Sequence, residues 1–197
     1  MANYTAQDVK TLRERSGAGM MDCKSALDEA DGNLDKAMEV LRLKGLKGVT
    51  KREGRTTSNG LIVARVNGGT GYLIELACET DFVAKASKFI ELADKVADAV
   101  AAAGATTLEA ALAADLGGKT VQDAINDEAA IMGEKVELRK VGSLKDAAVD
   151  AYMHRTSKDL PPQVGVLVAY SGSDADTAHD VAAVSYTHLT LPTICSV

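Results

Sequence analysis

A change of hydrophobic period near residue 80 constrains the fold of this chain more than any other feature. Residues 72–78 form a short apolar run that is typical of a β-strand. Beyond residue 80, apolar residues recur every three or four positions, as they do on one face of an amphipathic helix. This face is formed by Phe82, Ala86, Phe89, Ala93, Val96 and Val100. A strand that leads directly into such a helix predicts an α+β fold, in which helices pack on a sheet.

Further runs predict partners for this strand in a small antiparallel sheet. Residues 61–66 are strand-like, and the glycine-rich residues 67–71 supply a turn, so that 61–66 and 72–78 form a hairpin. Residues 134–141 alternate between apolar and charged side chains, which is the pattern of a half-exposed strand. We expect this strand to join the hairpin. Another strand is predicted at residues 164–170, followed by a helix.

The first 45 residues predict three short helices in a compact module. Thr5 and Asp8 form a capping-box pattern at the start of the first helix. Gly45 is placed to end the third helix in a left-handed conformation. Met20 and Met21 begin the second helix and point about 100° apart, so they cannot both face one core. Either one of them is exposed, or both are partly buried where the helix begins.

Shifts of composition divide the chain into segments. Residues 46–59 are rich in Lys and Arg and are interrupted by Gly48 and Gly54. We interpret them as a solvated hinge rather than as a contact to phosphates or the ribosome. The predicted segments are a three-helix module (1–45), a basic linker (46–59), a first α+β core unit with a sheet packed on helices (60–142), a second core unit (143–184) and a tail (185–197).

Composition argues against several classes of function. The net charge of −6 disfavours extensive contact with nucleic acid. The cysteines Cys23, Cys78 and Cys195 form no CxxC pair, so neither a zinc site nor a disulfide framework is indicated. No secretion signal opens the chain, and no apolar run approaches the roughly 18 residues of a membrane span. We therefore expect a cytoplasmic protein that makes no membrane contact.

One short motif invites a nucleotide-binding interpretation that its context does not support. Gly118-Lys119-Thr120 matches the end of a phosphate loop, but the first glycine of that motif would fall at Ala113, and no strand precedes it. Acidic residues and histidines are scattered, with no nucleophile–base pair and no metal-ligand spacing. The chain is thus expected to bind no nucleotide directly, to need no cofactor and not to be an enzyme.

Residues 79–85 connect the predicted strand to the predicted helix. Thr80 or Asp81 can cap the helix, because a short side-chain oxygen accepts from the free N–H groups of the first turn. The acidic Asp81 also suits the positive end of the helix dipole. Phe82 comes next and has two interpretations, as the first core residue of the helix or as an exposed side chain in its first turn. Periodicity alone leaves both open.

Two blocks of sequence resemble the signatures of one family. Residues 80–85, Thr-Asp-Phe-Val-Ala-Lys, resemble the signature of the elongation factor Ts family, the nucleotide exchange factors of the translational GTPase EF-Tu. Residues 12–15 and 17–27 resemble the amino-terminal signature of that family. The resemblance implies a fold like that of ubiquitin-associated (UBA) domains for the three-helix module. It stops near Val184, so we expect the second core unit to be incomplete and the tail to be a truncated or frame-shifted end unlike the family.

The resemblance also implies a function and a set of contact residues. The chain would bind EF-Tu in its GDP-bound and nucleotide-free forms and promote GDP release by disturbing the Mg²⁺ and phosphate site. Residues placed near that site are Thr80, Asp81, Phe82 and Val83. Residues placed at other contacts are Met20, Met21, Lys24, Met132 and His154. The alternative is a ubiquitin-like or ribosome-binding adaptor without exchange activity, which would bind through residues 1–59.

Overall fold

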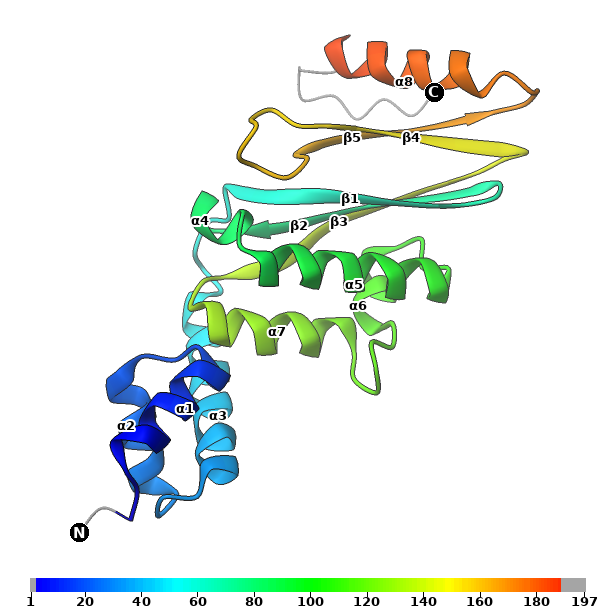
Figure 1. Cartoon of the computed structure of the whole chain (residues 1–197). Coiled ribbons are helices and arrows are strands. Elements are labelled where there is room, and N and C mark those ends of the chain that lie inside the picture. The colour runs from blue at the N-terminus through cyan, green and yellow to red at the C-terminus, as the bar shows by residue number, and fades with distance from the viewer. Residues whose placement is uncertain (1–2, 189–197) are drawn as a thin grey trace. The chain divides into compact units, whose positions relative to one another are not determined.

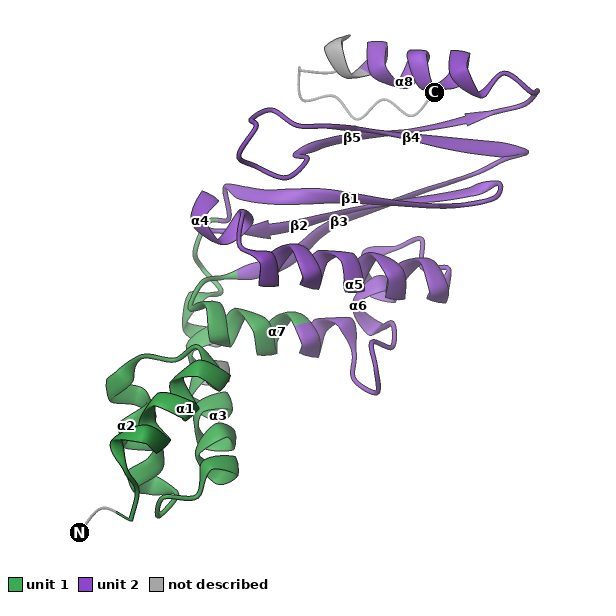
Figure 2. Cartoon of the chain, viewed as in Figure 1, with its two compact units in different colours: residues 1–56, 125–135 green, residues 57–124, 136–197 purple. Residues whose placement is uncertain are grey.

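The computed structural model describes residues 3–188, and the chain divides into two compact units (Figures 1 and 2). Unit 1 comprises residues 1–56 and 125–135, and unit 2 comprises residues 57–124 and 136–197. Helices and small antiparallel sheets occur together, so the predicted α+β class is confirmed. Most of the predicted tail, residues 189–197, lies outside the described residues.

Unit 1 is helical, and its first helices begin at the predicted caps. They are α1 (Ala6–Ser16), α2 (Met20–Glu29) and α3 (Leu34–Arg52). The Thr5 side chain accepts from the backbone of Asp8, and the Asp8 carboxylate accepts from the backbone N–H of Thr5 at 2.7 Å, which confirms the capping box. The three helices enclose a core of Val9, Leu12, Cys23, Ala26, Leu27, Ala30 and Ala37. This arrangement fits the predicted UBA-like module.

Helix α3 is longer than predicted, and Gly45 does not end it. The helix continues through Gly45 and Gly48 to Arg52, so half of the predicted linker is helical. A Cβ atom built on Gly45 would lie 2.6 Å from the Cβ of Ala130, in the second segment of the same unit. Gly45 therefore allows this segment to approach α3 closely. The interpretation of Gly45 as a helix terminator was wrong, because α3 continues through it. The residue that Gly45 packs against, Ala130, is remote in sequence and could not be identified from a local pattern.

Unit 2 contains the predicted hairpin and its third strand. The hairpin consists of β1 (Asn59–Asn67) and β2 (Thr70–Cys78), and the third strand is β3 (Val136–Lys145). They form one antiparallel sheet in the order β1-β2-β3. Asn67 pairs with Thr70, so the turn consists of Gly68 and Gly69, and Gly68 has a φ of 58° that glycine adopts without strain. Because β3 extends to Lys145, the predicted boundary at residue 143 falls within a strand.

The predicted long helix is broken into two. Helix α4 (Asp81–Ala84) is a single turn, and α5 (Ser87–Ala103) begins after Ala86, which has an extended conformation with φ −70° and ψ 135°. The predicted face is buried along α5, from Phe89 to Val100. Phe82 does not belong to that face, because the extended residue takes α4 out of phase with α5. Helix α5 packs on β1 and β2.

A second sheet and a helix complete unit 2. The elements are β4 (Ala148–His154), β5 (Val164–Tyr170) and α8 (Ala175–His188). Figure 1 shows unit 2 as layers, with α8 on the β4–β5 sheet, this sheet on the β1–β2–β3 sheet, and α5 on the far side. A Cβ atom on Gly71 would lie 2.6 Å from Val149 Cγ1, so the sheets approach closely there. Strand β4 was not predicted, whereas β5 and α8 were.

Two further helices connect α5 to β3. They are α6 (Leu108–Ala113) and α7 (Val121–Met132). The Thr120 hydroxyl caps α7 by accepting from the backbone N–H of Asp123 at 3.0 Å. The residues that resemble a phosphate loop lie in the turn between these helices, so a helix rather than a strand precedes them. From residue 3 to residue 188, no helix combines the length and apolarity needed to cross a membrane.

Candidate partner-binding surface

The corner between β2 and α5 is held by local hydrogen bonds. Thr80 is the N-cap of α4, and its hydroxyl accepts from the backbone N–H of Val83 at 3.4 Å. The Cys78 thiol donates to the carbonyl of Thr80 at 3.2 Å. Ala84, in the same turn, is fully buried, which anchors α4 on unit 2. The cap thus fixes the direction in which the first turn of α4 leaves the sheet.

Phe82 points away from the core. It is 73% exposed, whereas Phe89, the other phenylalanine of the chain, is completely buried. The Lys85 ammonium lies 4.5 Å from the centre of the Phe82 ring and 3.2 Å from Asp81 Oδ2. The interpretation of Phe82 as a core residue is therefore wrong. A large exposed aromatic side chain held on a capped turn is suited to insertion into a partner.

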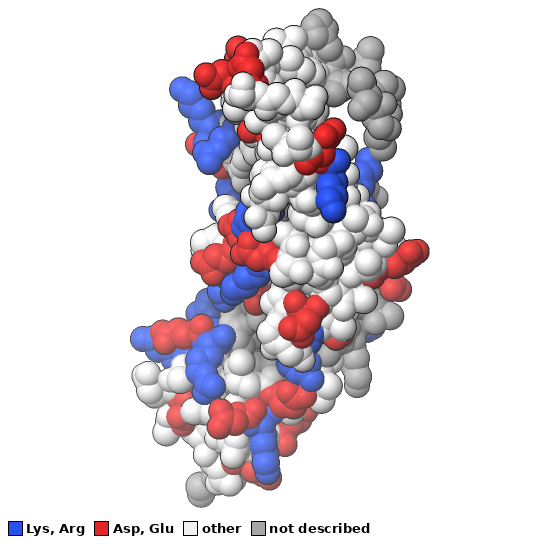
Figure 3. Space-filling model, turned by 90° about the vertical axis from the view of Figure 1, so that its right-hand side faces the viewer, with Lys and Arg blue, Asp and Glu red and all other residues white. Residues whose placement is uncertain are grey.

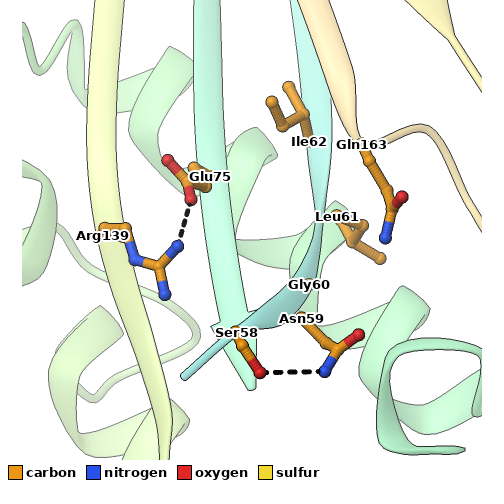
Figure 4. Close-up of a pocket in the computed structure, with 8 residues that line it drawn as sticks. All are labelled: Ser58, Asn59, Gly60, Leu61, Ile62, Glu75, Arg139 and Gln163. Atoms are coloured by element: carbon orange, nitrogen blue, oxygen red, sulfur yellow. Dashed lines mark hydrogen bonds and ion pairs between the residues drawn. The ribbon is translucent and has the colours of Figure 1, made fainter. Parts of the chain in front are cut away.

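The start of β1 braces this corner from the side. Asn59 Nδ2 donates to the carbonyl of Glu79 at 2.9 Å, and Ser58 Oγ lies 3.4 Å from the same carbonyl. Asn59 Nδ2 also donates to Ser58 Oγ at 3.3 Å (Figure 4). Glu79 immediately precedes the capping residue Thr80, so the position of this carbonyl affects the direction of α4. No sequence pattern indicated this brace, because Asn59 and Glu79 are 20 residues apart.

A pocket of about 230 Å³ opens beside the brace. Figure 4 shows its lining residues: Ser58, Asn59, Gly60, Leu61, Ile62, Glu75, Arg139 and Gln163. Arg139 donates to Glu75 Oε1 at 2.7 Å and also to the carbonyl and hydroxyl of Thr57. The charges of Arg139 and Glu75 neutralise each other, and the hydrogen bonds to Thr57 tie the segment just before β1 to β3. Within residues 3–188, no three His, Cys, Asp or Glu side chains are placed to share a metal ion.

His154 lies at the end of β4, in the same region of unit 2. Its carbonyl accepts from the backbone N–H of Gln163, which lines the pocket beside Asn59. The neighbouring Pro162 accepts from the backbone N–H of Ile62 in β1. The loop that follows His154 is thus tied to the start of β1, which braces the corner of Phe82. The half-exposed His154 ring has its Nδ1 atom 3.2 Å from the hydroxyl of Tyr152.

The remaining predicted contact residues belong to unit 1. Met20 and Met21 are 54% and 74% exposed, so both side chains are available, where the sequence required only one. Lys24 is exposed one turn further along α2, on the side of Met21. Met132 is half-buried at the end of α7. The exposed thioethers, which adapt their shape readily, give α2 an apolar surface with a basic neighbour.

Charge on the surface is mixed rather than gathered. On the face shown in Figure 3, Lys and Arg side chains lie beside Asp and Glu side chains and form no continuous basic area. Several charged side chains of the described residues pair, such as Arg65 with Asp94 and Asp98 at 2.8 and 2.6 Å. The hydrogen bond that Arg65 donates to Asp98 is the main cause of the raised pKa of Arg65. This surface lacks the basic stripe that is typical of nucleic-acid binding.

The fold and the corner define the class of this chain, an α+β protein with a three-helix amino-terminal module and an exposed phenylalanine on a capped turn. The family described as "Elongation factor TS" matches residues 79–186. The chain is 57% identical over 185 residues to elongation factor Ts of Paenarthrobacter aurescens and 60% identical over 182 residues to that of Clavibacter michiganensis subsp. michiganensis. It is 57% identical over 197 residues to that of Micrococcus luteus. The chain belongs to the elongation factor Ts family.

The alignments cover most of this chain but less of its relatives. The first two relatives match 92% of this chain, which spans 66% of their length, and the third matches 96% of it, with 71% of the relative covered. The family match includes the corner, β4, β5 and most of α8. The alignments therefore include the corner of Phe82 and the strand that carries His154.

Proposed function

We propose that this chain is a guanine-nucleotide exchange factor for EF-Tu in translation elongation. Family membership supports the role. The observation that carries it in the structure is Phe82, 73% exposed on a turn whose cap, brace and buried Ala84 hold it in place. A side chain of this size that remains exposed has no role in the core. Its rigid support reduces the entropy that is lost when a partner orders it.

The exchange mechanism requires no chemistry from this chain. A translational GTPase holds GDP through a phosphate loop and a Mg²⁺ ion. A factor that binds the nucleotide-free GTPase more tightly than the GDP-bound form must weaken GDP binding by the same factor, because the coupling is reciprocal. Phe82 would displace GTPase side chains beside the Mg²⁺ site, and Asp81 would bring a negative charge toward the same hydrogen bonds. Thr80 and Val83 complete the turn that holds both.

Lys85 modifies the part that Asp81 can play. Its ammonium lies 3.2 Å from the Asp81 carboxylate and 4.5 Å from the centre of the Phe82 ring. In the free protein the cation thus offsets the charge that Asp81 would present. An exposed pair of this kind contributes ~1 kcal/mol or less, so a partner can replace it readily. The spacing of four residues is a signal that the sequence did contain.

The amino-terminal module would contact a second surface of the GTPase. Met21 and Lys24 share one side of α2, with Met20 beside them, and Met132 belongs to the same unit. In unit 2, His154 would add a contact beside the corner. Contacts of this kind would be made with both the GDP-bound and the nucleotide-free GTPase. They would therefore raise the affinity of the complex without raising the rate of exchange.

A second candidate is an adaptor that binds only through the amino-terminal module. The exposed Met20 and Met21 on a module with its own core favour it. Two variants of the whole chain separate the candidates, Met21→Asp and Phe82→Ala. Exchange activity predicts that Phe82→Ala abolishes most of the stimulated GDP release from EF-Tu. An adaptor function predicts that only Met21→Asp affects binding and that the wild-type chain does not stimulate GDP release from EF-Tu.

A further inference from the structure

Lys85 contacts both of the side chains that the proposed exchange mechanism uses. It follows Asp81 by four positions and Phe82 by three, so its side chain falls between theirs around the axis of α4. Its ammonium lies 3.2 Å from Asp81 Oδ2 and 4.5 Å from the centre of the Phe82 ring, above the face of that ring. One cation thus contacts the carboxylate and the ring at once.

The backbone of α4 is fixed, whereas the Phe82 side chain is not held by the core. The Thr80 hydroxyl caps the turn, and the backbone N–H of Lys85 donates to the carbonyl of Asp81 at 3.1 Å. Phe82 is 73% exposed, so core packing does not choose between the two χ1 rotamers that a helical phenylalanine adopts. A contact on the ring itself is needed to select one of them.

The two contacts of Lys85 supply this selection together. A cation over an aromatic face is attracted by the negative face of the ring, and the Asp81 carboxylate attracts the same cation. Each attraction is weak at an exposed site, because water and salt screen it. Both act on one ammonium, however, so the Lys85 side chain loses its rotational freedom once for two contacts. Asp81 thus holds the cation, and the cation holds the ring.

We propose that Lys85 is a positioning residue that holds Phe82 in one rotamer before the partner binds. The proposal deepens the proposed function and rests on it, because the ordered ring is the group that would enter the GTPase. Ordering a free side chain during binding lowers affinity by a factor of roughly two to ten, and Lys85 reduces that loss in advance. Lys85 itself needs no contact with the GTPase for this role.

The first test measures the χ1 rotamer populations of Phe82 in the whole chain from NMR coupling constants. We expect one rotamer in the wild type. Lys85→Met keeps a long unbranched side chain without the charge, so the couplings should move toward the average of two rotamers. Asp81→Asn should move them in the same direction, whereas Lys85→Arg should preserve them, because Arg pairs with carboxylates and stacks on aromatic rings. Lys95→Met removes the charge of an exposed lysine of α5 and is the matched control, which should leave the couplings unchanged.

The second test is a double-mutant cycle on stimulated GDP release from EF-Tu. Lys85→Met should slow release about two- to tenfold, the loss expected for a ring that must be ordered during binding. Lys85→Arg should restore the rate, and Lys95→Met should not change it. In the Phe82→Ala background, Lys85→Met should have no further effect, because no ring remains to be positioned. The denaturant midpoint of each variant is measured alongside, so that release is compared per folded molecule.

Several results would overturn the proposal. Averaged couplings in the wild type, or unchanged couplings in Lys85→Met, would show that the cation does not select a rotamer of Phe82. Normal release by Lys85→Met would show that the selection does not matter for exchange. Losses that add in the double variant would indicate a direct contact of Lys85 with the GTPase instead. If the wild-type chain does not stimulate GDP release, the exchange function is refuted, and the couplings alone then decide whether Lys85 positions the ring.

Discussion

Replacement of Phe82 by alanine separates a binding role from a structural one. About a quarter of the side chain is covered, since it is 73% exposed. On a side chain of roughly 200 Å², that corresponds to ~50 Å² of apolar contact and to about 1 kcal/mol of stability at most. Phe89→Ala is the matched control, because Phe89 is completely buried and its truncation should cost about 3–5 kcal/mol.

The effect on exchange should run in the opposite order. An anchor at the centre of an interface carries ~2 kcal/mol or more, so Phe82→Ala should slow stimulated GDP release about thirtyfold. Phe89→Ala should release GDP normally per folded molecule. The assay pairs a denaturant midpoint with the rate of GDP release for each variant. The reasoning would be refuted if Phe82→Ala lowered the free energy of unfolding by about 3 kcal/mol and left exchange per folded molecule normal.

Three other predictions concern Asn59, two glycines of α3 and nucleotide binding. Asn59→Ala removes the donor to the Glu79 carbonyl and should lower exchange several-fold with a stability loss of about 1 kcal/mol; unchanged exchange would show that the brace does not affect the corner. Gly45→Ala should lower the unfolding midpoint, because its Cβ would lie 2.6 Å from that of Ala130. Gly48→Ala, in the same helix, meets only the end of the Arg52 side chain and should raise the free energy of unfolding by up to about 1 kcal/mol. A stability change of the same sign in both variants would contradict the packing argument. Calorimetric titration of the isolated chain with GDP should show no saturable binding, since the turn that contains Lys119 follows a helix and not a strand.

Features that depend on neighbours in sequence were predictable. The capping box of Thr5 and Asp8 and the cap at Thr120 each join residues three apart, and the structure contains both. The hairpin was also predictable, because alternating runs on either side of Gly68 and Gly69 leave few other pairings. Local rules therefore identified most of the elements and the fold class.

Features that depend on remote neighbours were not predictable. Gly45 has the usual appearance of a helix terminator, and only its proximity to Ala130 shows why the residue is glycine. The break at Ala86 carries no glycine, proline or capping side chain, so periodicity continued through it and placed Phe82 in the core face. The brace by Asn59 likewise joins positions 20 residues apart. Family resemblance, rather than pattern, singled out Asp81 and Phe82.

The most direct test of the account is GDP release from EF-Tu in the presence of this chain. EF-Tu loaded with a fluorescent GDP analogue is mixed with excess unlabelled GDP, with and without a substoichiometric amount of the wild-type chain. The account predicts that the chain accelerates release well above the spontaneous rate and that each molecule acts repeatedly, because it dissociates when nucleotide rebinds. An unchanged release rate at every concentration of a folded chain would contradict the central claim.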